Sequence, residues 1–183
     1  MSAQNPPPAA PLVIWAVSDG RAGIEAQVVG LANAVARKRP AQVVIKQIGW
    51  KSWIGRLPWW LTLFPRRLLT PQSDIAPPWP DIWIAAGRAT LPLSIRMKRW
   101  SGRKTYVVQV QDPHMPTRLF DLVIPPRHDR LEGDNVFPIT GSPGRVNAER
   151  MAADLQRVQA QLDVLPRPRV AVIIGGKSKA HDI

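Results

Sequence analysis

The sequence contains no cysteine, and its 13 acidic residues are few beside 25 lysines and arginines. Without thiols the chain can form no disulfide bond, thiolate metal site or cysteine nucleophile. The formal net charge of +12 at pH 7 favours an acidic partner: nucleic acid, anionic lipid or a phosphorylated substrate. A basic surface that is merely solvated explains the same charge, so composition alone does not choose a partner.

Long apolar segments are also missing. No uninterrupted apolar run approaches the roughly 18 to 20 residues that a membrane-spanning helix requires. The opening MSAQNPPPAAP has no basic stretch before an apolar core, so it is not a secretory signal, and its prolines predict a disordered arm over residues 1–11. We therefore expect a cytoplasmic protein that meets a membrane, if at all, peripherally at the inner face.

Apolar runs that are typical of strands alternate with amphipathic helical patterns. Strands are predicted at 12–17, 42–48, 80–87, 104–111, 120–126, 135–140 and 168–176, and helices from residue 24 to Pro40, near 89–100 and over 146–162. This alternation predicts an α/β fold with a doubly wound, Rossmann-like parallel sheet. We expect that domain to occupy residues 12–165. Residues 166–183, a strand and a glycine turn without their helix, then read as the start of a truncated second domain.

Polar and glycine-rich turns follow most of the predicted strands. They are SDGRAG, AAGR, QDP, PPRHD and TGSPG. Ligands of such sheets bind beyond the carboxyl ends of the strands, so these turns predict an acceptor or phosphate cleft. The residues expected to line it are Asp19, Gly20, Arg21, Gly23, Gln27, Gly87, Arg88, Gln111, Asp112, Gly141 and Ser142.

SDGRAG has two interpretations. Its small residues would let the first N–H groups of the following helix approach an anion, with Arg21 adding a charged contact. Alternatively, the glycines only form a tight turn and Asp19 caps the helix. The glycine spacing of a dinucleotide-binding turn is incomplete here.

Several other motifs are incomplete. GGKS at 175–178 matches only the end of a phosphate-binding P-loop, because Ala171 stands where its first glycine belongs, so nucleotide triphosphate hydrolysis is not predicted. His114, His128 and His181 lack metal-ligand spacing and are interpreted as surface residues; no metal and no cofactor are predicted. Neither a nucleophile elbow nor paired carboxylates support a hydrolase.

The segment 50–71 combines tryptophans with cations. This mixture suits a membrane interface, where rings lie at headgroup depth and cations meet anionic lipid. The predicted membrane-contact residues are Trp53, Trp59, Trp60, Arg66 and Arg67. In the alternative interpretation the aromatics fill the core beneath a long connection. Stacking of single-stranded nucleic acid is disfavoured, because no binding module is recognisable.

Five ordered blocks resemble the mitochondrial fission "elongated mitochondria" (Elm-type) family. They are SDGRAGIEAQVVGLANAV, PDIWIAAGRATLP, VVQVQDPHMPTRLFDLVIPPRHD, NVFPITGSPGRV and RVAVIIGGKSKAHD, from about residue 12 to the end. The resemblance implies a two-domain glycosyltransferase-B-like fold, with this chain as the amino-terminal domain that binds the acceptor. It implies sugar-nucleotide-dependent glycosyl transfer, with Gly175, Gly176 and Ser178 at a hinge facing the sugar donor. Because most of the donor domain would be missing, this fragment is expected to be inactive.

The same resemblance implies a second role, a non-enzymatic adaptor at a membrane surface that recruits a protein partner. The expected partners are thus a sugar nucleotide in the full-length protein, an anionic membrane or another protein. The family turn reads like DGR-x-GH followed by Gln; Asp19, Gly20, Arg21, Gly23 and Gln27 fit it, but Ile24 occupies the histidine position. If that histidine is a catalytic base in relatives, this chain lacks it.

Overall fold

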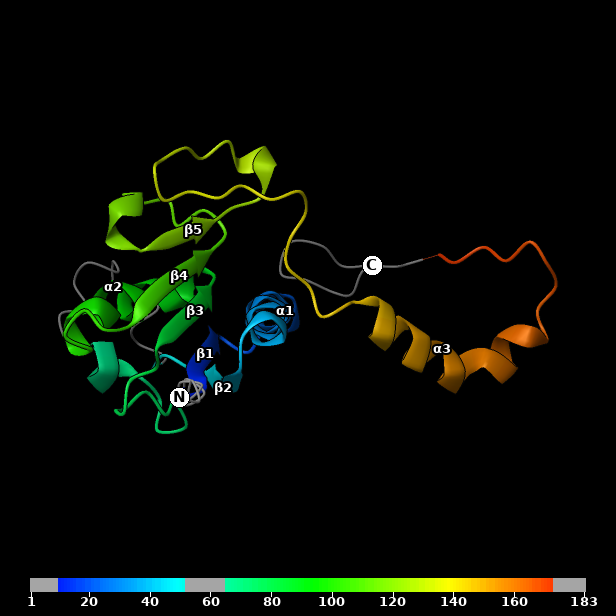
Figure 1. Ribbon diagram of the computed structural model, residues 1–183, viewed down its shortest axis with the longest axis horizontal. Coiled ribbons are helices and arrows are strands. Elements are labelled where there is room, and N and C mark those ends of the chain that lie inside the picture. Colours follow the sequence, from blue (N-terminus) through cyan, green and yellow to red (C-terminus); the bar gives the residue numbers. More distant parts are fainter. Residues whose placement is uncertain (1–9, 52–64, 173–183) are drawn as a thin grey trace, which may run out of the picture. The chain divides into compact units, whose positions relative to one another are not determined.

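The computed structural model describes residues 10–51 and 65–172, which divide between two compact units, Met1–Arg145 and Val146–Ile183. The first unit contains a sheet of five parallel strands in the order β2-β1-β3-β4-β5 (Figure 1). The strands are β1 (Leu12–Ser18), β2 (Ala41–Gln47), β3 (Ile82–Ala86), β4 (Tyr106–Val110) and β5 (Leu122–Ile124). This sheet confirms the α/β, Rossmann-like fold class.

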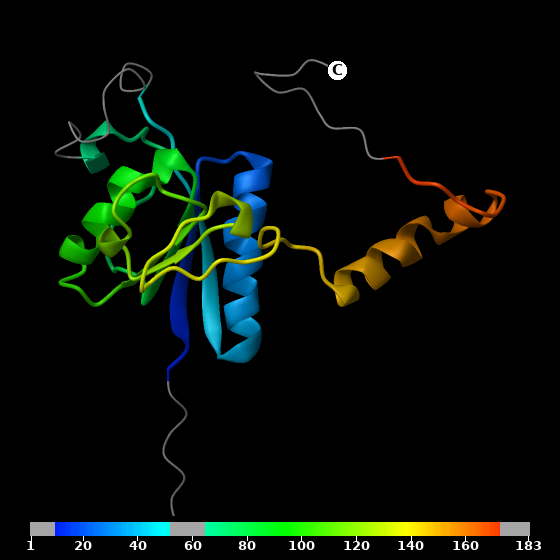
Figure 2. The same cartoon turned by 90° about the horizontal axis from the view of Figure 1, so that it is seen from above.

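The helices of the first unit cover opposite faces of the sheet. Helix α1 (Ala22–Lys38) packs on one face and α2 (Leu91–Trp100) on the other (Figures 1 and 2). Both helices end in basic residues, which favour the negative end of a helix dipole, and Pro40 prevents α1 from continuing. Because the helices alternate between faces, both sides of the central strands are buried.

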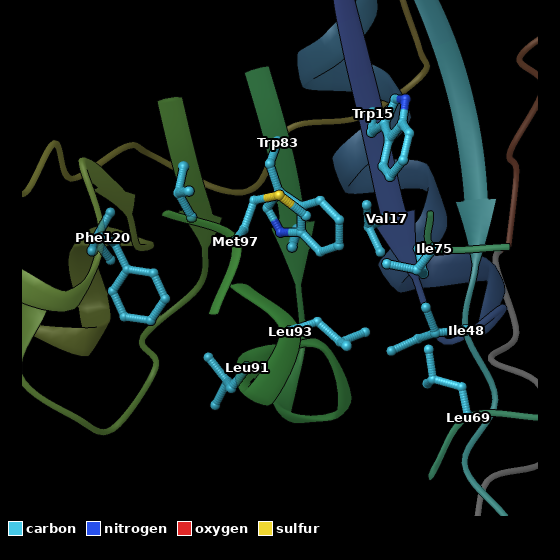
Figure 3. Close-up of a cluster of buried hydrophobic side chains, with 13 residues drawn as sticks. Trp15, Val17, Ile48, Leu69, Ile75, Trp83, Leu91, Leu93, Met97 and Phe120 are labelled. Atoms are coloured by element: carbon cyan, nitrogen blue, oxygen red, sulfur yellow. The ribbon is translucent and has the colours of Figure 1, made fainter. Parts of the chain in front are cut away.

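Two apolar clusters form the core of the first unit. The cluster beneath α2 centres on Trp83, which is fully buried beside Met97 and Leu93 (Figure 3). The cluster beneath α1 includes Ile14 and Val28, both 0% exposed. Burying each side chain of this size contributes about 1.5–3 kcal/mol, so the sheet and its two helices hold the turns at the strand ends in place.

One predicted strand, at 135–140, is wrong, and the described part of another, residues 168–172 of the strand predicted at 168–176, is not a strand. Residues 135–140 form only two isolated parallel bridges, Val123 with Val136 and Pro126 with Ile139. Phe137 and Ile139 donate to the carbonyls of Val123 and Pro125, but between these bonds Pro125 has no N–H to donate in return, so the ladder is interrupted. Residues 168–172 are neither helix nor strand, with Val170 and Val172 about 84% and 79% exposed. A strand needs neighbours for its backbone groups, and nothing in the described ranges pairs with this segment.

The second unit contains α3 (Ala148–Asp163), which confirms the predicted helix. Asn147 begins it: the Asn147 side chain accepts a hydrogen bond from the Arg150 N–H at 2.8 Å. Its apolar residues Met151, Leu155 and Val158 are exposed. The predicted limits at residues 165 and 166 stay predictions, and residues 1–9 and 173–183 lie outside the described ranges. Within those ranges, no helix combines the length and the apolar character that crossing a membrane takes.

Candidate functional site

The turn after β1 is organised by the carboxylate of Asp19. Its Oδ1 accepts the backbone N–H of Arg21 at 3.3 Å, and its Oδ2 accepts Nε and Nη2 of Arg21, each at 2.8 Å. Arg21, not Asp19, occupies the N-cap position of α1, so the interpretation of Asp19 as the helix cap is wrong. The physical reason is the short turn, in which the carboxylate reaches the next backbone N–H and the Arg21 side chain instead.

The turns after β1, β3 and β4 lie next to each other. A Cβ atom built on Gly87 would be 3.5 Å from Arg21 Nη2 and 3.6 Å from Ile24 Cγ2, so the backbone after β3 approaches the start of α1 closely. The φ of Gly87 is 79°, a backbone conformation that favours glycine. After β4, Gln111 Nε2 donates to Gln27 Oε1 at 3.1 Å. Residues predicted from separate motifs are thus neighbours in space.

A cavity of about 280 Å³, here called the carboxyl-edge cavity, opens beyond the ends of β3, β4 and β5. Its lining comes from three turns: Gly87, Arg88 and Leu91 after β3; Gln111, Asp112, Pro113 and His114 after β4; and Pro126, His128 and Asp129 after β5, with Gln109 contributed by β4 itself. Gly87, Arg88, Gln111 and Asp112 were predicted to line a cleft, and the structure brings these four together.

Two histidine–aspartate pairs face this cavity. His114 Nδ1 lies 3.2 Å from Asp112 Oδ2, and the backbone N–H of His114 donates to Asp112 Oδ1 at 2.7 Å. His128 Nε2 lies 3.4 Å from Asp129 Oδ1. The cavity therefore offers imidazole and carboxylate groups suited to proton transfer, with the exposed Arg88 as its permanent cation.

A buried polar chain positions the wall of the cavity at Gln109, which is 1% exposed. Its Oε1 accepts from Ser94 Oγ at 3.4 Å, and Ser94 Oγ accepts from Trp83 Nε1 at 2.9 Å. Its Nε2 donates to the Val110 carbonyl at 3.3 Å. A buried polar group that loses its hydrogen-bond partner destabilises the folded state, so the amide of Gln109 is held in one orientation. That orientation depends on Ser94 of α2 and therefore on the packing of α2 against the sheet.

The other predicted cleft residues lie outside this lining. Asp19, Gly20, Arg21, Gly23 and Gln27 belong to the adjacent start of α1, and Gly141 and Ser142 are exposed beyond the bridge at Ile139. Gly175, Gly176 and Ser178, predicted at the hinge, lie outside the described residues.

Seven residues of the lining are not among those expected from the sequence: Leu91, Gln109, Pro113, His114, Pro126, His128 and Asp129. Four of these, Pro113, Pro126, His128 and Asp129, belong to the turns QDP and PPRHD that were expected at this edge, and the adjacency of β4 and β5 brings the two turns together.

Glu25 of α1 joins two segments that are distant in sequence. Its Oε2 accepts from Gln47 Nε2 at 2.8 Å, and its Oε1 pairs with Arg145 Nη2 at 2.5 Å. These hydrogen bonds, with that from Gln47 the largest cause, lower the pKa of Glu25. A Cβ on Gly30 would lie 2.4 Å from the carbonyl oxygen of Gly144, so the chain at 144–145 crosses directly over α1.

The described part of the aromatic segment packs against the core. Trp50 is half-buried, and its Nε1 donates to the Ala89 carbonyl at 2.9 Å. The guanidinium of Arg66 lies 5.3 and 5.8 Å from the ring centroids of Trp79 and Trp100, which stack on each other. These contacts favour the core interpretation for Trp50.

Membrane contact by the five residues predicted for it stays a prediction. Arg66 and Arg67 contribute, with Trp100, to a second cavity of about 630 Å³, whose lining includes no residue of the turns after β3, β4 and β5. Trp53, Trp59 and Trp60 lie outside the described residues.

Comparison with known proteins gives a family and two relatives. The family described as Mitochondrial fission ELM1 matches residues 22–183. An uncharacterized protein of Rickettsia prowazekii is 31% identical over 203 residues, 91% of this chain and 54% of the relative. Mitochondrial fission protein ELM1 of Arabidopsis thaliana is 29% identical over 119 residues, 52% of this chain and 28% of that protein.

The chain thus spans about half the length of the Rickettsia relative, and the match covers less of the Arabidopsis protein. No solved structure matches.

Proposed function

Because the chain belongs to the mitochondrial fission ELM1 family, we propose that it is the acceptor-binding domain of a glycosyltransferase-B-like protein. In this proposal the whole protein transfers a sugar from a sugar nucleotide, and the acceptor binds at the carboxyl edge of the sheet. The observation that carries the proposal is the carboxyl-edge cavity, in which turns from three neighbouring parallel strands place Arg88, Asp112, His114 and His128 around one space.

The position of the cavity in the fold supports a ligand-binding role. In the strand order β2-β1-β3-β4-β5, the direction of strand addition reverses between β1 and β3. Ligands of open α/β sheets bind beyond the carboxyl strand ends at such a switch point. Arg21 after β1 and Gly87 after β3 meet there, and Gly87 is also part of the cavity lining.

The size of the cavity favours an acceptor group over a complete donor. Pockets for drug-sized ligands measure about 300–1,000 Å³. At about 280 Å³, the carboxyl-edge cavity suits one sugar-sized group with its hydroxyls. A complete sugar nucleotide needs further surface, which in this proposal belongs to the other half of the longer protein.

Calorimetric titration of the chain with a panel of sugars, sugar phosphates and sugar nucleotides tests the proposal. We expect at least one sugar or sugar phosphate to bind, and Arg88→Ala to weaken it about tenfold or more, because a cation at the cavity is lost. Arg37→Ala is the matched control: it removes the same charge at the far end of α1 and should leave the affinity unchanged.

Two results would contradict the proposal. If no member of the panel binds, the non-enzymatic adaptor role becomes the better account of this chain. If Arg88→Ala and Arg37→Ala weaken binding equally, the ligand is held by overall charge and not at the cavity.

A further inference from the structure

We propose that Asp112 and His114 form an oriented acid–base couple, in which Nε2 of His114 takes the proton from an acceptor hydroxyl group in the carboxyl-edge cavity. The part of this inference that concerns the acceptor rests on the proposed function. The part that concerns the orientation of the imidazole rests on the geometry of the turn after β4 alone.

One carboxylate holds both the ring and the backbone of His114. Asp112 Oδ2 lies 3.2 Å from Nδ1, and Asp112 Oδ1 accepts the backbone N–H at 2.7 Å. Because an ionised carboxylate only accepts hydrogen bonds, Nδ1 of the neutral ring carries the hydrogen in the proposed couple. Nε2 then keeps its lone pair, and no other residue of the described chain hydrogen-bonds to it.

The backbone of this turn is held in an uncommon conformation. Gln111 and His114 have φ values of 74° and 51°, in the left-handed region that residues with a side chain rarely adopt. The hydrogen bond from Gln111 to Gln27 and the buried ring of Pro113 fix the turn from both sides. Strain of this kind persists where surrounding contacts over-determine it, and here the result is a histidine placed on the cavity lining.

His114 suits this role better than the second histidine. His128 meets Asp129 at 3.4 Å through Nε2, with no accompanying backbone bond from that carboxylate, and its side chain is 81% exposed against 62% for His114. His114 also lines an adjoining hollow of about 420 Å³ that it shares with Arg88. It therefore stands where the carboxyl-edge cavity continues along the turn.

The charges of the lining favour a hydroxyl ligand over a phosphate at this point. Two carboxylates, of Asp112 and Asp129, face the cavity together with Arg88. With both histidines neutral, the lining carries one more negative than positive charge, so a phosphate is disfavoured beside Asp112 and His114, and Arg88 is the group that would hold one. A neutral hydroxyl group can instead donate its hydrogen bond to Nε2 of His114.

The proton transfer completes a balanced glycosyl transfer. The acceptor oxygen forms a bond to the anomeric carbon of the sugar donor, while the bond from that carbon to the phosphate oxygen breaks. The nucleoside diphosphate leaves with the bonding electron pair, and the acceptor proton moves to His114 Nε2. The carboxylate of Asp112 then faces an imidazolium ring and stabilises its charge.

The ring tautomer tests the couple without any ligand. Long-range ¹H–¹⁵N correlation spectra, recorded above the end of the histidine titration curve, should show His114 with its hydrogen on Nδ1. Asp112→Asn keeps the acceptor for the backbone N–H but can place an amide donor against Nδ1, so the hydrogen should move to Nε2. Asp129→Asn, the same change at the other pair, should leave His114 unaffected. A hydrogen on Nε2 in the unaltered chain, or no switch in Asp112→Asn, overturns the inference.

Turnover supplies the second readout. In the whole protein of the proposed function, which includes the donor half, release of nucleoside diphosphate from UDP-N-acetylglucosamine, with a bound sugar or water as acceptor, should fall about 10²- to 10⁴-fold in His114→Gln at unchanged affinity for the nucleotide. Arg37→Ala, at the far end of α1 and outside the cavity lining, is the control and should retain the rate. An unchanged rate in His114→Gln overturns the inference. If no sugar nucleotide binds or turns over, the proposed function fails, and the tautomer result alone decides whether the couple exists.

Discussion

Two glycines of α1 should respond in opposite directions to the same substitution. Gly23 and Gly30 both lie within this helix, but a Cβ on Gly23 meets nothing within 4 Å, whereas a Cβ on Gly30 would lie 2.4 Å from the carbonyl oxygen and 2.5 Å from the carbonyl carbon of Gly144. In a helix, alanine is more stable than glycine by about 1 kcal/mol. We therefore expect Gly23→Ala to stabilise the protein by about 0.5–1 kcal/mol.

The clash at Gly30 should outweigh the same gain. Ordinary contact begins at 3.4 Å, so the Gly144 backbone must move by about 1 Å. Overpacking of this kind costs about 1–3 kcal/mol. The movement also weakens the ion pair between Arg145 and Glu25, whose side chains are 34% and 19% exposed. Because the pair is partly exposed, this loss adds at most about 1 kcal/mol to the cost of the substitution. The net expectation for Gly30→Ala is a loss of about 1–2 kcal/mol.

Urea unfolding followed by tryptophan fluorescence and far-ultraviolet circular dichroism measures both variants. The two free energies of unfolding should differ by about 2 kcal/mol, with the unaltered chain between them. If Gly30→Ala stabilises the protein as much as Gly23→Ala does, the segment at residues 144–145 does not cross α1 as described, and the reasoning is refuted.

Further predictions concern one titrating group and one buried ring. The pKa of Glu25 is lowered in the folded state, so its contribution is present above the ordinary glutamate pKa and lost as pH falls through the folded value. The stability gap between the unaltered chain and Glu25→Gln should therefore narrow from about pH 7 to pH 3; a constant gap would contradict the assignment. Trp83→Phe leaves Ser94 without the Nε1 donor at 2.9 Å and should cost about 1–3 kcal/mol in urea unfolding. A neutral result would show that this buried bond is unimportant.

The local elements of the first unit could be predicted because each has a local cause. The apolar run from Leu12, the spacing of Val28 and Ala32 on α1, and the stop at Pro40 depend on residues close in sequence. At 135–140 the pairing with the β5 segment is interrupted at Pro125, which has no N–H to donate. The failure at 168–172 has a cause that is not local. A β pattern becomes a strand only when another strand offers hydrogen bonds, and no local pattern reveals that partner.

The sequence predicts at which edge of the sheet the candidate site lies, but not which chemical groups gather there. The turns after the strands predict a cleft at the carboxyl end of the sheet, and four of the residues expected there, Gly87, Arg88, Gln111 and Asp112, line the cavity. The sequence predicts His114 and His128 to be surface residues, and both are exposed. What brings them to one cavity is the adjacency of β4 and β5, a property of strand order that spacing along the chain does not contain.

The most direct test of the functional account is a map of amide chemical-shift changes when the sugars and sugar phosphates of the panel are added to the ¹⁵N-labelled chain. The account predicts changes concentrated at residues 87–88, 109–114 and 126–129, the three turns around the carboxyl-edge cavity. An absence of changes at these turns, or changes concentrated at Arg66, Arg67 and Trp100 around the second cavity, would contradict it.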